Sequence, residues 1–159
     1  FALTMAQRCR EAIALDVSED AVARIKANAA RNNVQVDARA GNVFDELRAF
    51  ERSGERFDTI VLDPPAFAKS KSAIDKASSG YKEINLRALR MLDAGGILVT
   101  CSCSHHVGEA DLLQIVAEAA LDAGKTLRVL ERRTQSADHP IVLTVPETHY
   151  LKCLILEVL

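Results

Sequence analysis

The sequence predicts a single α/β domain built on a doubly wound, mostly parallel sheet. Short apolar runs of strand type alternate with segments of helical period, which is the pattern of parallel strands joined by crossover helices. The 159 residues fit one ordinary domain. A composition of 48% hydrophobic and 26% charged residues is typical of folded globular domains. Disordered, collagen-like and disulfide-scaffold proteins are therefore excluded.

The first part of the chain supplies three of the predicted strands and two helices. Ser18 is placed to cap a helix that ends at Asn32-Asn33, and Gly54 ends the next helix. The run DTIVL is the strongest strand signal, because a continuous apolar run is typical of a strand buried on both faces. The predicted strands span residues 12–17, 34–38 and 58–62, and the second helix spans residues 43–52.

The second part begins with a polar segment, residues 66–80, that reads as a long surface loop. A helix over residues 83–92 is expected to stop at Gly95-Gly96. Further strands are predicted at 97–103, 126–130 and 150–158, and a helix at 111–123. Residues 135–149 are predicted to be a connection with a β-like stretch at 141–145. We expect the final strand to be antiparallel, because no convincing helix precedes it.

Charge and cysteine content limit the function further. The net charge of −2 gives no overall attraction for a polyanion, so any nucleic acid has to be held locally. The four cysteines lack the spacing of a disulfide framework, which favours reduced thiols and a cytoplasmic location. No apolar run approaches the roughly 18 residues of a membrane span. We therefore expect no membrane partner.

Ligands of open α/β sheets bind beyond the carboxyl ends of the strands, so polar residues at those ends are the candidates. Asp16 ends the first strand and could accept both hydroxyl groups of a ribose, or serve only as an anion near a helix start. Asn42 follows the second strand and could contact an adenine, or form a plain turn with Gly41. Asp63 ends the DTIVL strand.

The DPP segment (residues 63–65) is a sharper signal. Its two prolines have a fixed φ angle, so the segment is rigid enough to position a planar base, with Asp63 polarising the ring. The alternative is a strand closed by proline with an exposed aspartate. Lys69 and Tyr81 follow in a basic stretch suited to phosphate contacts and stacking, although solvated loop lysines are more common.

Cys103 lies at the end of the next strand, beside Ser102 and Ser104. A strand end that runs into polar residues allows a reactive thiolate, whereas a buried inert thiol is the ordinary alternative and the better one for Cys101. Metal binding with the following histidines lacks the second cysteine pair of a structural zinc site, so we expect no metal. Cys9 and Cys153 are expected in the core.

Four segments together resemble the S-adenosyl-L-methionine (SAM)-dependent methyltransferases that make 5-methylcytosine in large-subunit ribosomal RNA. The segments are FDTIVLDPPAFAKSK, GYKEINLRALRMLDAGGILVTCSCS, QSADHP and PETHYLK. The resemblance implies a Rossmann-like class I methyltransferase, with Asp16 on the SAM ribose and Asn42 beside the adenine. Asp63 and Cys103 would be the catalytic residues, with Cys103 as the nucleophile. Asp63 and Pro64 would also contact the cofactor, and the substrate contacts would be Pro65, Phe67, Lys69 and Tyr81.

The resemblance also implies ribosomal RNA as the partner and leaves a homodimer open. Relatives carry an N-terminal PUA domain and a glycine-rich SAM loop, and no G-x-G element occurs among the seven glycines of this chain. Residues 1–159 therefore resemble a partial methyltransferase domain with its N-terminal strand truncated, and we expect this chain by itself to bind SAM weakly or not at all. Two other functions compete: methylation of an exocyclic nitrogen, which needs no thiol, and a non-catalytic module that binds RNA.

Overall fold

The computed structural model describes residues 1–67 and 74–159. The chain forms two compact units, Phe1–Ala49 and Phe50–Leu159, and each unit has a sheet of its own. Helix α3 (Val43–Ser53) crosses the boundary between them. No helix in the described ranges is long and apolar enough to cross a lipid bilayer.

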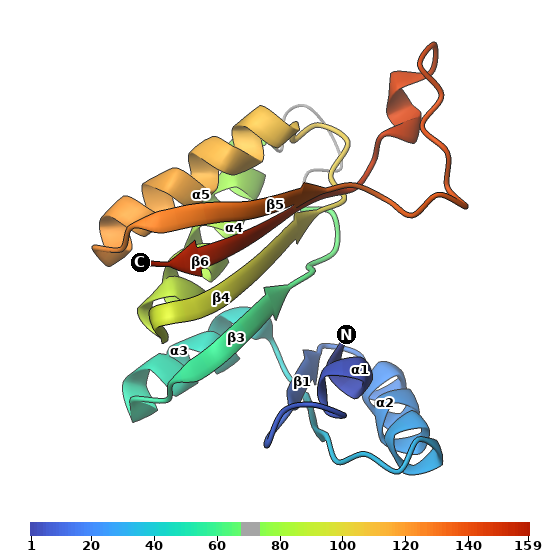
Figure 1. Cartoon of the computed structure of the whole chain (residues 1–159), viewed down its shortest axis with the longest axis vertical. Coiled ribbons are helices and arrows are strands. Elements are labelled where there is room, and N and C mark those ends of the chain that lie inside the picture. Colours follow the sequence, from blue (N-terminus) through green and yellow to red (C-terminus); the bar gives the residue numbers. More distant parts are fainter. Residues whose placement is uncertain (68–73) are drawn as a thin grey trace. The chain divides into compact units, whose positions relative to one another are not determined.

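The first unit is a small parallel sheet with two helices (Figure 1). Strands β1 (Ile13–Asp16) and β2 (Asp37–Ala40) pair in parallel, and the register sets Asp16 opposite Ala40. Helix α1 (Ala2–Met5) precedes them, and α2 (Glu19–Arg31) connects them. Ser18 caps α2 as predicted, since the Ala21 amide donates to Ser18 Oγ over 3.2 Å. Both strands therefore end at the same edge.

The second unit contains a four-stranded sheet with the order β3-β4-β6-β5. Strands β3 (Phe57–Leu62) and β4 (Leu92–Ser102) are parallel, whereas β6 (Lys152–Val158) runs antiparallel to both β4 and β5 (Leu127–Arg133). Three strands therefore share one direction and the last strand opposes them. The predicted α/β fold with a mostly parallel sheet and an antiparallel final strand is confirmed.

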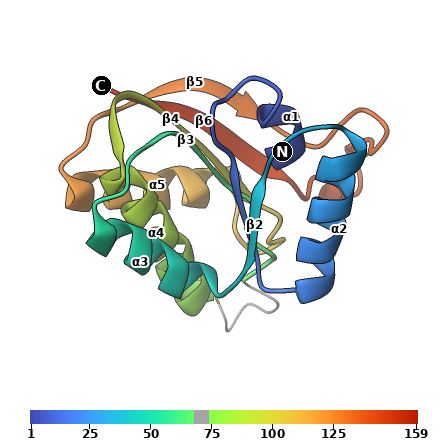
Figure 2. The ribbon, with the colours of Figure 1, turned by 90° about the horizontal axis from the view of Figure 1, so that it is seen from below.

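Helices α4 (Ile74–Arg90) and α5 (Glu109–Ala123) lie on one face of this sheet (Figure 2). Each buries an apolar face, because its large apolar side chains recur at helical spacing. The fully buried side chains of the unit include Ile84, Leu89, Leu98, Leu112 and Leu154. The core of the second unit thus lies between the helices and the sheet.

Two predicted boundaries in the middle of the chain were wrong. Helix α4 begins at Ile74, inside the segment predicted as a loop, because Ala77, Tyr81 and Ala88 form a buried stripe that serines and a glycine obscure. The same helix ends at Arg90, before Gly95-Gly96. These glycines lie inside β4, where the pairing shifts from Phe57↔Leu92 to Thr59↔Ile97 and Gly95 has a φ of +84°.

Two further differences concern predicted strands. Strand β2 starts at Asp37, three residues later than predicted, because Asn33 adopts a left-handed φ of 52° and the Val34 amide still bonds to Ala29 O. Within residues 135–149 the β-like stretch reduces to an isolated bridge between Val142 and Val145, followed by a 3-10 turn, η2 (Pro146–Thr148). This segment extends away from the sheet as an arm (Figure 1).

Candidate active site

The carboxyl edge of the first unit carries Asp16 and Asn42. Asp16 is half-buried at the end of β1, and its Oδ1 accepts a hydrogen bond from the Ser18 amide at 2.8 Å. Among the residues described, its Oδ2 has no hydrogen-bond donor. The Asp16 carboxylate therefore has one oxygen hydrogen-bonded to the protein and one oxygen available, which fits a site that accepts hydrogen bonds from the two hydroxyl groups of a ribose.

Asn42 is exposed and begins α3. Its Oδ1 accepts from the Phe44 amide at 2.9 Å, and its carbonyl oxygen accepts from the Asp45 and Glu46 amides. The turn expected as the plain alternative is therefore present. Among the described residues, the Nδ2 group of this exposed side chain makes no hydrogen bond, so its donors match the acceptor nitrogens of an adenine. The residues of this edge thus fit the nucleoside part of SAM.

In the second unit, Cys103 lies against the DPP segment. The segment follows β3 directly, and Cys103 follows β4, the parallel neighbour of β3. The half-buried Cys103 Sγ donates to the carbonyl oxygen of Pro64 across 3.8 Å. Asp63 and Pro65 are exposed beside this contact, and Pro64 is half-buried. The pairing of β3 with β4 therefore brings the Cys103 thiol to the DPP segment, of which Asp63 is the first residue.

Tyr81 does not occupy the predicted substrate-contacting position. It lies on α4 with 0% of its surface exposed, so its ring cannot stack on a base in this arrangement. Its hydroxyl group lies 2.9 Å from Ser104 Oγ and accepts a hydrogen bond from Ser102 Oγ at 3.1 Å. Tyr81 therefore links the two serines on either side of Cys103 through hydrogen bonds. The sequence does not reveal this role, because the first turns of α4 carry no clear helical pattern.

The other predicted substrate contacts have different outcomes. Phe67 is half-buried, and its ring packs on that of Tyr81 with centroids 4.7 Å apart. Lys69 lies outside the described residues. Lys82, from the same basic stretch, forms ion pairs with Glu118 at 3.5 Å and Asp122 at 3.0 Å. The charge of Lys82 is therefore balanced within the protein rather than offered to phosphate.

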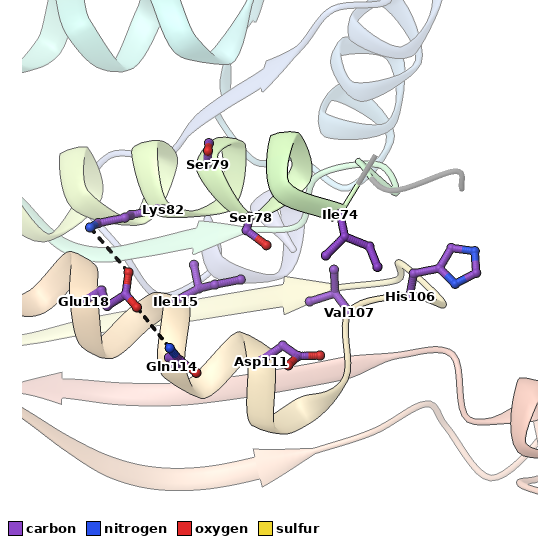
Figure 3. A pocket seen from close by; sticks show the side chains of 10 residues that line it. All are labelled: Ile74, Ser78, Ser79, Lys82, His106, Val107, Asp111, Gln114, Ile115 and Glu118. Atoms are coloured by element: carbon purple, nitrogen blue, oxygen red, sulfur yellow. Dashed lines mark hydrogen bonds and ion pairs between the residues drawn. The ribbon is translucent and has the colours of Figure 1, made fainter. Parts of the chain in front are cut away.

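Lys82 and Glu118 are among the residues that line a groove of about 570 Å³ between α4 and α5 (Figure 3). A hydrogen bond to Asp122 is the main reason that the pKa of Lys82 lies above its usual value. Gln114 Nε2 donates to Glu118 Oε1 at 3.2 Å. Lys82, Gln114 and Glu118 therefore satisfy part of one another's hydrogen-bonding and charge requirements.

The remaining cysteines differ from expectation in part. Cys101 is buried as expected, and burial together with the neighbouring Cys153 thiol raises the pKa of the Cys101 thiol. Cys153 is half-buried, and Cys9 is exposed rather than in the core. Cys9 lies just beyond the short helix α1, where little of the described chain covers it. Cys103 is thus the half-buried thiol that also contacts the DPP segment.

Sequence reasoning missed Lys152. This residue begins β6 opposite Ser102, is 5% exposed, and donates from Nζ to the Ser104 carbonyl oxygen at 2.7 Å. A signal was present, because strand alternation puts Lys152 on the same face as Leu154, Leu156 and Val158, which are all buried. A lysine on the apolar face of a strand indicates a special environment.

The solved structures that share this fold include a protein named as a methyltransferase. A protein of Streptococcus mutans named as a SAM-dependent methyltransferase aligns over 94% of this chain and 39% of that chain, with a TM-score of 0.80 and 17% identity. NSun6 from Pyrococcus horikoshii, solved with SFG, aligns over 97% of this chain and 43% of that chain, with a TM-score of 0.61 and 17% identity. The fold is thus that of the Rossmann-like methyltransferases.

The chain belongs to the methyltransferase small domain family, whose model matches residues 1–131. The predicted cofactor, SAM, is the methyl donor of this class. Ribosomal RNA large subunit methyltransferase I of Tolumonas auensis is 46% identical over 151 residues, which are 93% of this chain and 38% of that protein. Its counterpart from Pseudoalteromonas translucida is 44% identical over 153 residues, covering 94% of this chain and 39% of that protein. The chain thus spans about two fifths of these relatives.

Proposed function

We propose that this chain is the catalytic part of an enzyme that methylates C5 of a cytosine in large-subunit ribosomal RNA. The names of relatives at 46% and 44% identity support ribosomal RNA as the substrate class. The choice of cytosine C5 depends on one observation of the chain itself: the Cys103 thiol lies 3.8 Å from the Pro64 carbonyl oxygen. A nucleophile beside the DPP segment is what a covalent mechanism at a pyrimidine requires.

A covalent step is needed because C5 of cytosine is too weakly nucleophilic to take a methyl group unaided. In the proposed reaction Cys103 first gives its proton to solvent, and Sγ then forms a bond to C6. The electron pair of the C5–C6 double bond moves toward N3 and makes C5 nucleophilic. Asp63 lies at the carboxyl end of β3. Its carboxyl group would stabilise the charge that develops at N3 and the amino group when the thiolate adds to C6.

When bound, SAM would supply the electrophilic methyl group that C5 takes up, and the rest of the cofactor would leave as S-adenosylhomocysteine. A base then removes the C5 proton, the C5–C6 double bond forms again, and the bond from Cys103 Sγ to C6 breaks. Asp16 and Asn42 would hold the ribose and adenine of the cofactor, as their open oxygen and amide donor allow. The target base has to leave its stack to reach the thiol.

The test uses the full-length protein with SAM and a ribosomal RNA transcript that contains 5-fluorocytidine. Fluorine at C5 cannot leave as a proton, so the adduct with Cys103 should accumulate as a complex that resists denaturation. The Cys103→Ala variant should form none, whereas Cys101→Ala serves as the matched control and should still form it. Cys101 lies two residues earlier, is buried, and forms no hydrogen bond with the DPP segment in the described chain.

Two outcomes would contradict the proposal. Methyl transfer to ordinary RNA by the Cys103→Ala variant would favour methylation of an exocyclic nitrogen. RNA binding without SAM binding would favour a non-catalytic module.

A further inference from the structure

Lys152 places a buried positive charge next to the segment that carries Cys103. Nζ donates to the carbonyl oxygen of Ser104 at 2.7 Å and to that of Tyr150 at 3.0 Å. Both acceptors are neutral, and only 5% of the residue is exposed. Within residues 1–67 and 74–159, no carboxylate forms an ion pair with Lys152. The ammonium group is therefore hydrogen-bonded but not neutralised.

This arrangement costs stability. Burial lowers the pKa of Lys152, and the ionisable groups of Cys103 and Asp111 act in the opposite direction. A methionine of similar length could fill the same space on the apolar face of β6 without a desolvated charge. A function for the charge itself would account for a lysine at this position.

Cys103 is the neighbouring group on which negative charge would form during the proposed reaction. Asp111, on α5, is exposed, and its Oδ2 already accepts a hydrogen bond from the Gly108 amide at 2.8 Å. Cys103 is half-buried and adjoins Ser104, whose carbonyl oxygen holds the ammonium. A cation in a poorly solvated environment interacts with a nearby anion more strongly than it would in water.

We propose that Lys152 is a positioning residue for Cys103, with two effects that rest on the function proposed above. Its hydrogen bond to Ser104 fixes the main chain directly after Cys103, across from the DPP segment. Its positive charge attracts anionic groups to the sulfur of Cys103. The register of β4 with β6 sets up both effects, because it pairs Ser102 with Lys152.

The charge can be measured without RNA or SAM. Iodoacetate and iodoacetamide alkylate the same thiolate, but only iodoacetate is anionic, so the ratio of their rates reports the electrostatic potential at the sulfur. Tandem mass spectrometry separates Cys103 from the other three cysteines, and N-acetylcysteine amide in the same reaction is the neutral reference. In the wild-type chain at low salt, we expect the ratio at Cys103 to exceed the reference ratio and to fall as sodium chloride is added.

Two variants separate charge from packing. Lys152→Met should lower the iodoacetate to iodoacetamide ratio at Cys103 by about threefold to tenfold, whereas Lys152→Arg should keep it within about twofold. Lys125→Met is the matched control, since Lys125 Nζ also donates to a main-chain carbonyl, that of Leu92 at 2.8 Å, but at the opposite end of β4. It should leave the ratio unchanged.

An unchanged ratio in a folded Lys152→Met chain would overturn the proposal and leave Lys152 a structural role only. If that variant does not fold, the wild-type measurement still decides: a ratio at Cys103 that equals the reference and does not respond to salt would refute it. Neither result depends on whether cytosine is the substrate. A failure of the adduct experiment and a failure of this proposal are therefore distinguishable.

Discussion

Removal of the Tyr81 hydroxyl group tests the hydrogen-bond cluster that holds the chain around Cys103. In Tyr81→Phe the ring still fills its site on α4 and still packs on Phe67. The variant loses two contacts, to Ser104 Oγ at 2.9 Å and to Ser102 Oγ at 3.1 Å. Both serines are 0% exposed, so water cannot replace the lost hydroxyl group.

The size of the effect follows from that burial. Each hydrogen bond contributes about 0.5–1.5 kcal/mol net, and a buried donor left without an acceptor costs about 1–3 kcal/mol. Ser102 keeps one interaction, because its Oγ accepts from the Ser104 amide at 3.3 Å. We therefore expect the free energy of unfolding to fall by about 2 kcal/mol. For a chain of this size that corresponds to a decrease in Tm of about 4–8 °C.

Urea and thermal unfolding of the full chain, followed by circular dichroism, measure this loss. Tyr150→Phe is the matched control, because Tyr150 is the other of the two tyrosines in the chain and is 38% exposed. It should change the free energy of unfolding by less than about 0.5 kcal/mol. A Tyr81→Phe chain as stable as this control would refute the idea that a buried hydroxyl cluster supports the Cys103 segment.

Two further predictions concern stability. Burial and the Cys153 thiol raise the pKa of the Cys101 thiol in the folded chain. The contribution of the neutral thiol to folding stability is therefore fully present below about pH 8.5 and is lost as the pH rises. Above that pH the free energy of unfolding should fall by up to about 1.4 kcal/mol per pH unit. Urea unfolding at several pH values should show a flatter dependence in Cys101→Val than in the wild-type chain. Parallel pH profiles for the two chains would contradict this prediction. Gly124 ends α5 with a φ of +64°, and no atom lies within 4 Å of a Cβ added there. Gly124→Ala should therefore lower the free energy of unfolding by about 1–2 kcal/mol through backbone strain alone. An unchanged melting temperature would count against this prediction.

Local signals predicted most of the elements and the main site residues. A continuous apolar run that stops at two prolines fixes both the end of β3 and the DPP segment. The capping serine of α2 and the left-handed Gly124 after α5 also have local causes. The start of α4 was missed because serines and a glycine interrupt the pattern of its buried side chains. Gly95-Gly96 was wrongly predicted to end a helix, because glycines also occur at an irregularity within a strand.

The sequence by itself determined which residue types stand at the strand ends: Asp16 as the last residue of β1, Asn42 after β2, the DPP segment after β3, and Cys103 after β4. Only the tertiary structure decided their neighbours within the second unit. Cys103 meets Pro64 across 39 positions of sequence, Tyr81 meets Ser104 across 23, and Lys152 meets Ser104 across 48. Such contacts depend on strand order and on the β4-β6 register, which arise from packing of the whole sheet rather than from any local pattern.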